Sequence, residues 1–424
     1  MNLLVKNAVL VDPLGGREGK ADILIRGAVI EKLGSGLEAQ GLEILDAGGL
    51  HVFPGFIDLH THFREPGFEA KETLQSGALA ALKGGYVASV SMPNTNPPCD
   101  QQSVVETILR KAKEVPYHVF PAGTISKGRL GKELSEMADL KKAGAVGVSD
   151  DGDWVADSLL MRRAMEYASM LGLLVMSHCE DRRLSAEGVM NEGLSSTRLG
   201  LRGIPAVSED VAVARDLELA RYTGARLHLC HLSTARSVEL LRRAKAEGIQ
   251  VTAEVTPHNL SLTDEEIEGY NTNFKMYPPL RTDEDAAALR KALREGVVDC
   301  VATDHAPHTQ EEKMRQFDEA PFGTIGLETS LGVVLTELYH KEKWKLSEIV
   351  RVMSVRPAEI LGISDRFGRI AEGLAANLAL VDVDRGWTVA PEELRSRSRN
   401  SCFMKKMLKG RVSATICSGK IWKF

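Results

Sequence analysis

The sequence predicts an α/β protein: a (β/α)8 TIM-like barrel with a small flanking β domain built from both termini. Three observations support this prediction. The middle of the chain has eight short apolar runs, most of the segments between them have helical periodicity, and the regions on either side contain only short strand-like runs. Buried parallel strands read as continuous apolar runs, and helical crossovers connect them. An open doubly wound sheet is the alternative, but no glycine-rich phosphate loop supports it.

Residues 1–52 are predicted to form the first part of the flanking β domain. Runs such as Val9–Val11 and Ile23–Ile25 alternate with polar residues, and glycine pairs at 15–16 and 48–49 separate the runs. This pattern is typical of small antiparallel β-structure. Strand-like runs return after residue 364, so we expect one composite domain built from residues 1–52 and 365–424.

Residues 53–364 are predicted to form the barrel. Its eight expected strands are 52–59, 87–92, 118–122, 145–149, 173–177, 226–230, 250–255 and 298–303. Segments between them, such as 104–113 and 208–223, have apolar residues at three- and four-residue spacing, which predicts helices.

The last part of the chain is expected to complete the flanking domain. Residues 377–381, 411–417 and 420–422 read as strands. Before the second of these strands lies a basic stretch, Arg395–Arg411. We interpret it as a solvated connecting loop rather than a binding surface for an anionic partner.

Composition excludes several classes of protein. The 424 residues include 53 Lys and Arg against 58 Asp and Glu, a net charge of −5, which argues against a nucleic-acid-coating protein. No apolar run approaches the roughly 18–20 residues that cross a bilayer, and the start does not read as a signal peptide. The six cysteines form no CxxC pair, which favours reduced, buried thiols and a cytoplasmic location.

Polar residues stand where the predicted strands end, which is where barrel enzymes carry their chemistry. His60 and His62 lie two residues apart on the first strand, so both side chains face the same side. Two imidazoles on one side can bind a metal ion together. Further candidate ligands at other strand ends are Asp150 or Asp151, His178, His231 and Asp304. Periodicity does not choose between the two aspartates. His228 lies inside its strand and is predicted to be structural.

The candidate ligands supply nitrogen and oxygen but no thiolate. Histidine with carboxylate suits Zn²⁺, with Mn²⁺, Co²⁺ or Fe²⁺ as substitutes. Six ligands exceed what one tetrahedral zinc needs. A pair of metal ions about 3.5–4 Å apart that share one carboxylate would use all six.

These residues resemble the dihydroorotase family of the amidohydrolase superfamily. Asp58–Gly67 is similar to its first motif, and Ala302–His308, with Lys313 following, is similar to its second. Met92–Pro98 and Asp150–Gly152 also match. The resemblance covers nearly the whole chain and implies the type I bacterial enzymes, in which an aspartate bridges two zinc ions in place of a carboxylated lysine. No lysine lies between Ala145 and Gly152, which agrees.

The resemblance also implies an activity: reversible conversion of N-carbamoyl-L-aspartate to L-dihydroorotate in pyrimidine biosynthesis. By position, it gives one zinc of each subunit to His60, His62, Asp151 and Asp304, and the second to Asp151, His178 and His231. Asp304 is the implied catalytic acid–base. The implied substrate contacts are His62, Arg64, Asn94, Tyr277, His308, Phe322 and Gly323. Arg64, Asn94 and His308 are assigned to the substrate carboxylate, and Phe322–Gly323 to its ring.

Three positions depart from the family pattern: Thr61, Asn259 and Tyr277. Tyr277 stands where the family usually has an asparagine that contacts substrate, so we expect a changed ring pocket. The long charged loop Pro307–Thr324 is expected to order over bound substrate.

Two alternatives are weighed against a dihydroorotase. A hydantoinase or allantoinase would keep the chemistry but change the ring, and Arg64 with His308 favours an acidic substrate instead. A non-enzymatic subunit that only supports a transcarbamoylase could lose its metal ligands, but all six are present. We expect a homo-oligomer, with aspartate carbamoyltransferase as a candidate partner.

Overall fold

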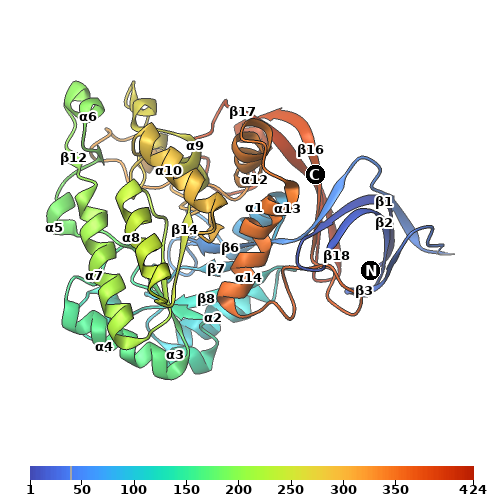
Figure 1. Ribbon diagram of the computed structural model, residues 1–424, viewed down its shortest axis with the longest axis horizontal. Coiled ribbons are helices and arrows are strands. Elements are labelled where there is room, and N and C mark those ends of the chain that lie inside the picture. Colours follow the sequence, from blue (N-terminus) through green and yellow to red (C-terminus); the bar gives the residue numbers. More distant parts are fainter. Residues whose placement is uncertain (39–40) are drawn as a thin grey trace.

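The centre of the structure, a computed structural model that describes residues 1–38 and 41–424, is a ring of eight parallel strands (Figure 1). In order around the ring they are β6 (Phe56–Thr61), β7 (Tyr86–Ser91), β8 (His118–Gly123), β9 (Gly147–Val148), β10 (Leu174–Ser177), β13 (Leu227–Leu229), β14 (Val251–Val255) and β15 (Cys300–Val301). A parallel bridge between Thr61 and His305 joins the two ends. The barrel prediction is therefore confirmed.

Helices cover the outside of the ring, between the strands (Figure 1). They are α1 (Leu74–Lys83), α2 (Gln102–Ala112), α3 (Met137–Ala143), α4 (Ser158–Leu171), α5 (Arg182–Ser185), α6 (Leu194–Leu199), α7 (Val207–Thr223), α8 (Ala235–Ala246), α9 (Pro257–Ser261), α10 (Asp283–Arg294), α11 (Gln310–Lys313), α12 (Ser330–Val334), α13 (Leu346–Val350) and α14 (Arg356–Leu361). The predicted helices 104–113 and 208–223 correspond to α2 and α7. Shorter helical segments, including η3 (Thr272–Phe274), and the two-stranded pair β11 (Met190–Asn191) and β12 (Gly203–Ile204) complete this part.

Local sequence explains where helices begin and end. Thr73 caps α1 by accepting a hydrogen bond from the Ser76 N–H, and Ser76 reciprocates. Asp157 caps α4 in the same sense, and Gly172 ends it in the left-handed conformation (φ 65°) that favours glycine.

The first predicted strand, 52–59, is wrong as a single element. The structure divides it at Gly55 into β5 (His51–Pro54), which pairs in the flanking sheet, and β6, which begins the barrel. A Cβ on Gly55 would lie 2.3 Å from Val87 Cγ1, so the chain passes too close to β7 for any side chain at that point. Apolar continuity alone could not show this division.

Both chain ends contribute to the flanking sheet, as predicted, and both termini lie at that end of the molecule (Figure 1). Its strands are β18 (Lys420–Lys423), β17 (Met407–Cys417), β16 (Leu378–Thr388), β5, β1 (Asn2–Asp12), β2 (Arg17–Arg26) and β3 (Val29–Gly34), and β4 (Glu43–Asp46) also pairs with β1. The sheet is mixed rather than antiparallel, because β1 pairs in parallel with β4 and β5. The domain boundaries at residues 52 and 364 stay a proposal.

The prediction of a solvated loop at Arg395–Arg411 is also wrong. Residues alternate along its first part: Arg395, Arg397 and Arg399 are exposed, whereas Ser396, Ser398 and Asn400 are buried. The buried side chains are small and polar, so hydropathy does not mark them as interior. This part of the chain packs against the loops that follow β6 and β15.

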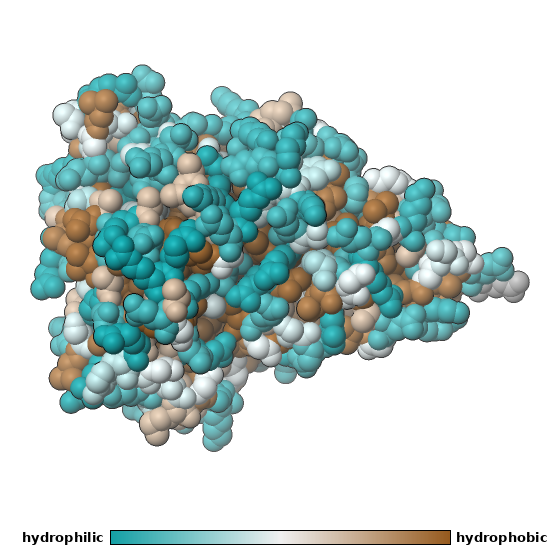
Figure 2. Space-filling view, viewed as in Figure 1, coloured by the Kyte–Doolittle hydropathy of each residue, from teal (hydrophilic) through white to brown (hydrophobic). Residues whose placement is uncertain are grey.

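The surface agrees with the composition. Figure 2 shows a largely hydrophilic face with scattered hydrophobic residues. Within the described ranges, every helix is too short or too polar to span a bilayer. All six cysteines are buried and free of disulfides.

Candidate metal centre and substrate cavity

Five strand ends bring the six predicted metal ligands together. His60 is the penultimate residue of β6, His62 and His178 directly follow β6 and β10, and Asp151, His231 and Asp304 come two or three residues after β9, β13 and β15. All are buried. Two groups of donors have ligand atoms within 4.8 Å of one another: His60, His62 and Asp151, and Asp151, His178 and His231. Asp151 belongs to both groups.

The structure chooses between the two aspartates that the sequence left open. Asp150 accepts hydrogen bonds from the N–H groups of Ile125 and Ser126 at 2.9 and 3.0 Å, so it fastens a loop. Asp151 instead faces the histidines. Its oxygens lie 3.4 Å from the nearest ring nitrogens of His178 and His231.

Asp304 completes the cluster. Its Oδ1 lies 3.0 Å from His62 Nε2 and 3.7 Å from His60 Nε2. Asp304 (φ 45°) and His231 (φ 36°) both have the left-handed backbone that is uncommon outside glycine. Strained residues of this kind cluster at functional sites, where the surrounding structure holds them in place.

The donor set fits a metal ion. His60 Nε2 and Asp151 Oδ1 are buried and have no hydrogen-bond partner among the described residues. Their separation of 3.4 Å is long for a hydrogen bond but matches the edge of about 3.3 Å expected of a tetrahedron with zinc–ligand bonds near 2.0 Å. Burial opposes a charge on Asp151, yet the surrounding histidines outweigh burial and hold its pKa well below the ordinary value. An ionised carboxylate is the form that binds metal.

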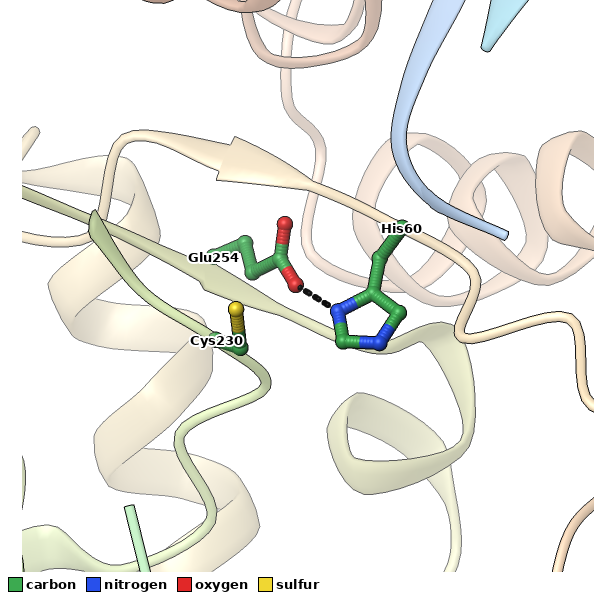
Figure 3. Close-up of side chains that lie close together, drawn as sticks. All are labelled: His60, Cys230 and Glu254. Carbon is green, nitrogen blue, oxygen red and sulfur yellow. Dashed lines mark hydrogen bonds and ion pairs between the residues drawn. The ribbon is translucent and has the colours of Figure 1, made fainter. Parts of the chain in front are cut away.

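Glu254 on β14 lies beside His60 and orients its ring (Figure 3). This fully buried carboxylate accepts a hydrogen bond from His60 Nδ1 at 2.7 Å and one from His228 Nε2 at 3.0 Å. The bond to His60 fixes the proton on Nδ1 and leaves Nε2 free to bind metal. Cys230 lies beside this pair, but burial raises the pKa of its thiol, so it stays protonated and is a poor ligand. His228, which the sequence predicts to be structural, also contacts Thr252 Oγ1 through Nδ1 at 2.8 Å.

Sequence reasoning missed Glu254, although a signal was present. Glu254 is the single charged residue of a strand that is predicted to be buried, so it needs a buried partner.

A cavity of about 390 Å³ opens beside the cluster. Its lining includes His62, Asp151, His178 and Asp304, together with every substrate contact that the family resemblance implied. The volume suits a small ring rather than a polymer.

One wall of the cavity is cationic. Arg64 Nη2 lies 3.4 Å from His308 Nε2, and Lys71 Nζ lies 3.4 Å from His308 Nδ1. Burial lowers the pKa of Arg64 to about 10, so it remains charged at neutral pH. Burial, followed by Arg64 and Lys71, holds the pKa of His308 far below the ordinary value, so this imidazole is neutral. No local pattern marks Lys71 in the sequence, because a lysine in a polar loop is ordinary.

Asn94 supports a metal ligand as well as lining the cavity. Its Oδ1 accepts a hydrogen bond from His62 Nδ1 at 2.8 Å, which leaves His62 Nε2 to face Asp151 and Asp304. The Asn94 amide nitrogen has no hydrogen-bond partner within the described part of the chain.

Tyr277, Phe322 and Gly323 form the opposite side. The Tyr277 ring stacks on His178 with centroids 5.1 Å apart, its centroid lies 4.9 Å from that of Phe322, and its hydroxyl lies 3.1 Å from Ser185 Oγ. A Cβ on Gly323 (φ 133°) would lie 2.8 Å from the Cβ of Ala306, so glycine permits this close approach.

Comparison with known proteins supports the resemblance seen in the sequence. Residues 49–237 match the "Dihydro-orotase-like" family model, and residues 206–422 match the "Amidohydrolase family" model. The dihydroorotase of Pelotomaculum thermopropionicum is 48% identical over 421 residues, which cover 99% of this chain and 98% of that protein. That of Caldanaerobacter subterraneus subsp. tengcongensis is 46% identical over 422 residues, or 99% and 97%.

Solved structures agree on the fold. The L-hydantoinase (dihydropyrimidinase) from Arthrobacter aurescens superposes with a TM-score of 0.88 at 26% identity, covering 99% of this chain and 95% of that one. The D-hydantoinase from a Thermus species gives 0.85 at 26%, covering 99% and 94%. The chain belongs to the dihydroorotase family of metal-dependent cyclic amidohydrolases, which act in pyrimidine biosynthesis.

Proposed function

We propose that this cavity interconverts N-carbamoyl-L-aspartate and L-dihydroorotate with two zinc ions bridged by Asp151. One observation carries the proposal: two histidine–carboxylate groups share Asp151 beside a cationic cavity wall. His60, His62, Asp151 and Asp304 would hold one ion, and Asp151, His178 and His231 the other. When bound, zinc supplies Lewis-acid chemistry that lowers the pKa of water and polarises a carbonyl group.

Asp304 is the proposed acid–base. Its carboxylate lines the cavity, with Oδ1 3.0 Å from His62 Nε2, so it can accept a proton from the attacking water and deliver it to the departing amide nitrogen of the ring. Burial opposes its charge, but the surrounding histidines lower the pKa of Asp304 below the ordinary value. It is therefore ionised and ready to accept a proton at neutral pH.

The cationic wall is the proposed site for the substrate carboxylate. The Arg64 guanidinium can donate two parallel hydrogen bonds to it. Asn94 adds an amide N–H. The uncharged His308 ring, held between Arg64 and Lys71, completes the wall without adding charge.

Tyr277, Phe322 and Gly323 are the proposed ring pocket. Tyr277 and Phe322 offer aromatic faces to a planar ring. Gly323 contributes shape rather than hydrogen bonds, because its N–H already donates to the Lys275 carbonyl at 2.9 Å. Closure of the Pro307–Thr324 loop over substrate stays a prediction.

The hydantoinases that share this fold are named for a different ring. Arg64 favours an acidic substrate in the present cavity, because a neutral ring would supply no negative charge to this buried guanidinium.

The test combines metal quantification with hydrolysis of L-dihydroorotate by the purified protein. We expect two zinc ions per chain and turnover that disappears after chelation and returns with Zn²⁺. Turnover of hydantoin or allantoin in preference to dihydroorotate would contradict the proposal, and so would full activity without metal.

We further propose a cytoplasmic location, supported by six buried cysteines that form no disulfide. The homo-oligomer and the aspartate carbamoyltransferase partner stay predictions. Sedimentation of the protein alone, and then with that partner, tests both.

A further inference from the structure

The backbone of Gly323 is held from three sides at the edge of the cavity. Lys313 Nζ donates hydrogen bonds to the carbonyls of Pro321 and Gly323, each at 2.9 Å, and to that of Lys275 at 3.3 Å. Three carbonyl oxygens thus converge on one ammonium group. The same Lys275 carbonyl accepts the Gly323 N–H.

Burying the Lys313 side chain without a carboxylate partner is energetically unfavourable, which indicates that its position serves a role. The side chain is 7% exposed and forms no ion pair with a carboxylate in the described part of the chain. A buried cation is tolerated only when its donors are satisfied. Burial, followed by the charge of Lys275, lowers the pKa of Lys313 to about 7.

Asn400 connects the Gly323 backbone to the stretch of chain that carries His308. Its Oδ1 accepts a hydrogen bond from the His308 N–H at 3.1 Å, and its Nδ2 donates to the carbonyls of Ala306 at 3.0 Å and Gly323 at 3.1 Å. One amide side chain thereby satisfies three backbone groups, two at the start of the Pro307–Thr324 loop and one at its end. It comes from the stretch after Arg395, far from this loop in the sequence.

The two ends of this loop also lie close together. A Cβ on Gly323 would lie 3.1 Å from His308 Cδ2, so a larger residue at this position would crowd the ring. Asn400 and Lys313 do not line the cavity themselves. Their influence on substrate can only pass through the groups they hold.

We propose that Lys313 and Asn400 are positioning residues for the dihydroorotate reaction, which hold His308 and the Phe322–Gly323 segment in the arrangement that receives substrate. The inference rests on the proposed function. It gives the C-terminal stretch a role at the cavity, which its place between strands of the flanking sheet does not suggest.

The test compares Asn400→Ala and Lys313→Met with the parent enzyme. Both variants lose hydrogen bonds but leave every metal ligand in place, so metal content should not change. We expect KM for dihydroorotate to rise about 10- to 100-fold, the scale on which small misplacements act, while kcat changes less than about threefold. Asn191→Ala is the matched control. Asn191 is also buried and bonded, to Asp264 and Arg281, but lies outside the cavity, so its KM should stay at the parental value.

Asn400→Asp is a more conservative variant, which keeps the test decisive if Asn400→Ala does not fold. It keeps the size and the acceptor for the His308 N–H but replaces the donor to two carbonyls, so KM should rise here as well. Amide hydrogen exchange of residues 306–325, measured without substrate, should be faster in all three variants than in the parent and in Asn191→Ala.

The inference is overturned if KM stays within about twofold of the parent in Asn400→Asp and in Lys313→Met, or if metal content falls instead. A parent enzyme that does not hydrolyse dihydroorotate would refute the proposed function instead. In that case, unchanged amide hydrogen exchange of residues 306–325 in the variants would separately show that Lys313 and Asn400 do not hold this stretch in place.

Discussion

The Asp304 carboxylate is proposed both to bind metal and to transfer a proton, since it borders the metal cluster and faces the cavity. We predict that Asp304→Asn retains substrate binding better than turnover, because the amide keeps the shape but cannot shuttle a proton. Turnover should fall about 10²- to 10⁴-fold or more, while KM changes much less. Steady-state kinetics on variant protein with verified metal content measure both. Near-normal turnover would show that another group is the acid–base.

Arg64 tests the carboxylate site. Arg64→Lys keeps the positive charge but loses the planar fork and the Nε bond to the Pro307 carbonyl. We predict a KM rise of about tenfold for dihydroorotate, equivalent to the loss of one charge-assisted hydrogen bond. Lys127→Arg, an exchange at an exposed residue that does not line the cavity, serves as the control. Unchanged KM in Arg64→Lys would remove this residue from the carboxylate site.

At the level of single residues, the sequence predicted those whose chemistry follows from position. His60 and His62 lie two residues apart at the end of one strand, and the other ligands come within three residues of the end of a strand. Position could not separate Asp150 from Asp151, because adjacent residues at the end of a strand can turn either way. Lys71 and Asn400 were missed for a different reason. Each acts through contacts with residues that are remote in sequence, and no local pattern records them.

Among the elements, β14 matters most for the metal centre, because it carries Glu254. We predict that Glu254→Gln weakens zinc binding about 10- to 100-fold, since the neutral amide holds the His60 tautomer less firmly. Competition with a chelator of known affinity measures the change. Thr252→Val removes only the hydrogen bond to the far side of His228, so its effect should be smaller. Equal zinc affinity in Glu254→Gln and the parent would contradict this role.

The elements themselves were predicted to different degrees. Barrel strands and helices such as α2 and α7 follow from apolar periodicity, because each buries a continuous stripe. The division of 52–59 and the burial of Ser396 and Asn400 do not, because both depend on what lies next to the backbone in three dimensions. Parallel pairing of β1 with β4 and β5 is equally invisible to a local pattern.

On the scale of the whole molecule, one topological fact gathers the site. Parallel strands in a closed ring all point their carboxyl ends to the same rim, so ligands separated by up to 244 residues meet there. The same arrangement concentrates two buried aspartates and four histidines in one place. It includes buried polar atoms, such as His60 Nε2, that have no hydrogen-bond partner in the part of the chain that the structure describes.

Metal removal should therefore destabilise the entire barrel rather than one loop. A ligand that binds only the folded state stabilises it by about 4 kcal/mol when present at 1,000 times its dissociation constant. We predict that chelation lowers the midpoint of thermal unfolding by several degrees and that added Zn²⁺ restores it, as calorimetry would measure. Asp151→Asn is the matched variant: it keeps the volume but weakens both halves of the cluster, so its midpoint should depend far less on Zn²⁺. A parental midpoint that is the same with and without chelator would mean that these six side chains do not hold metal in the folded protein.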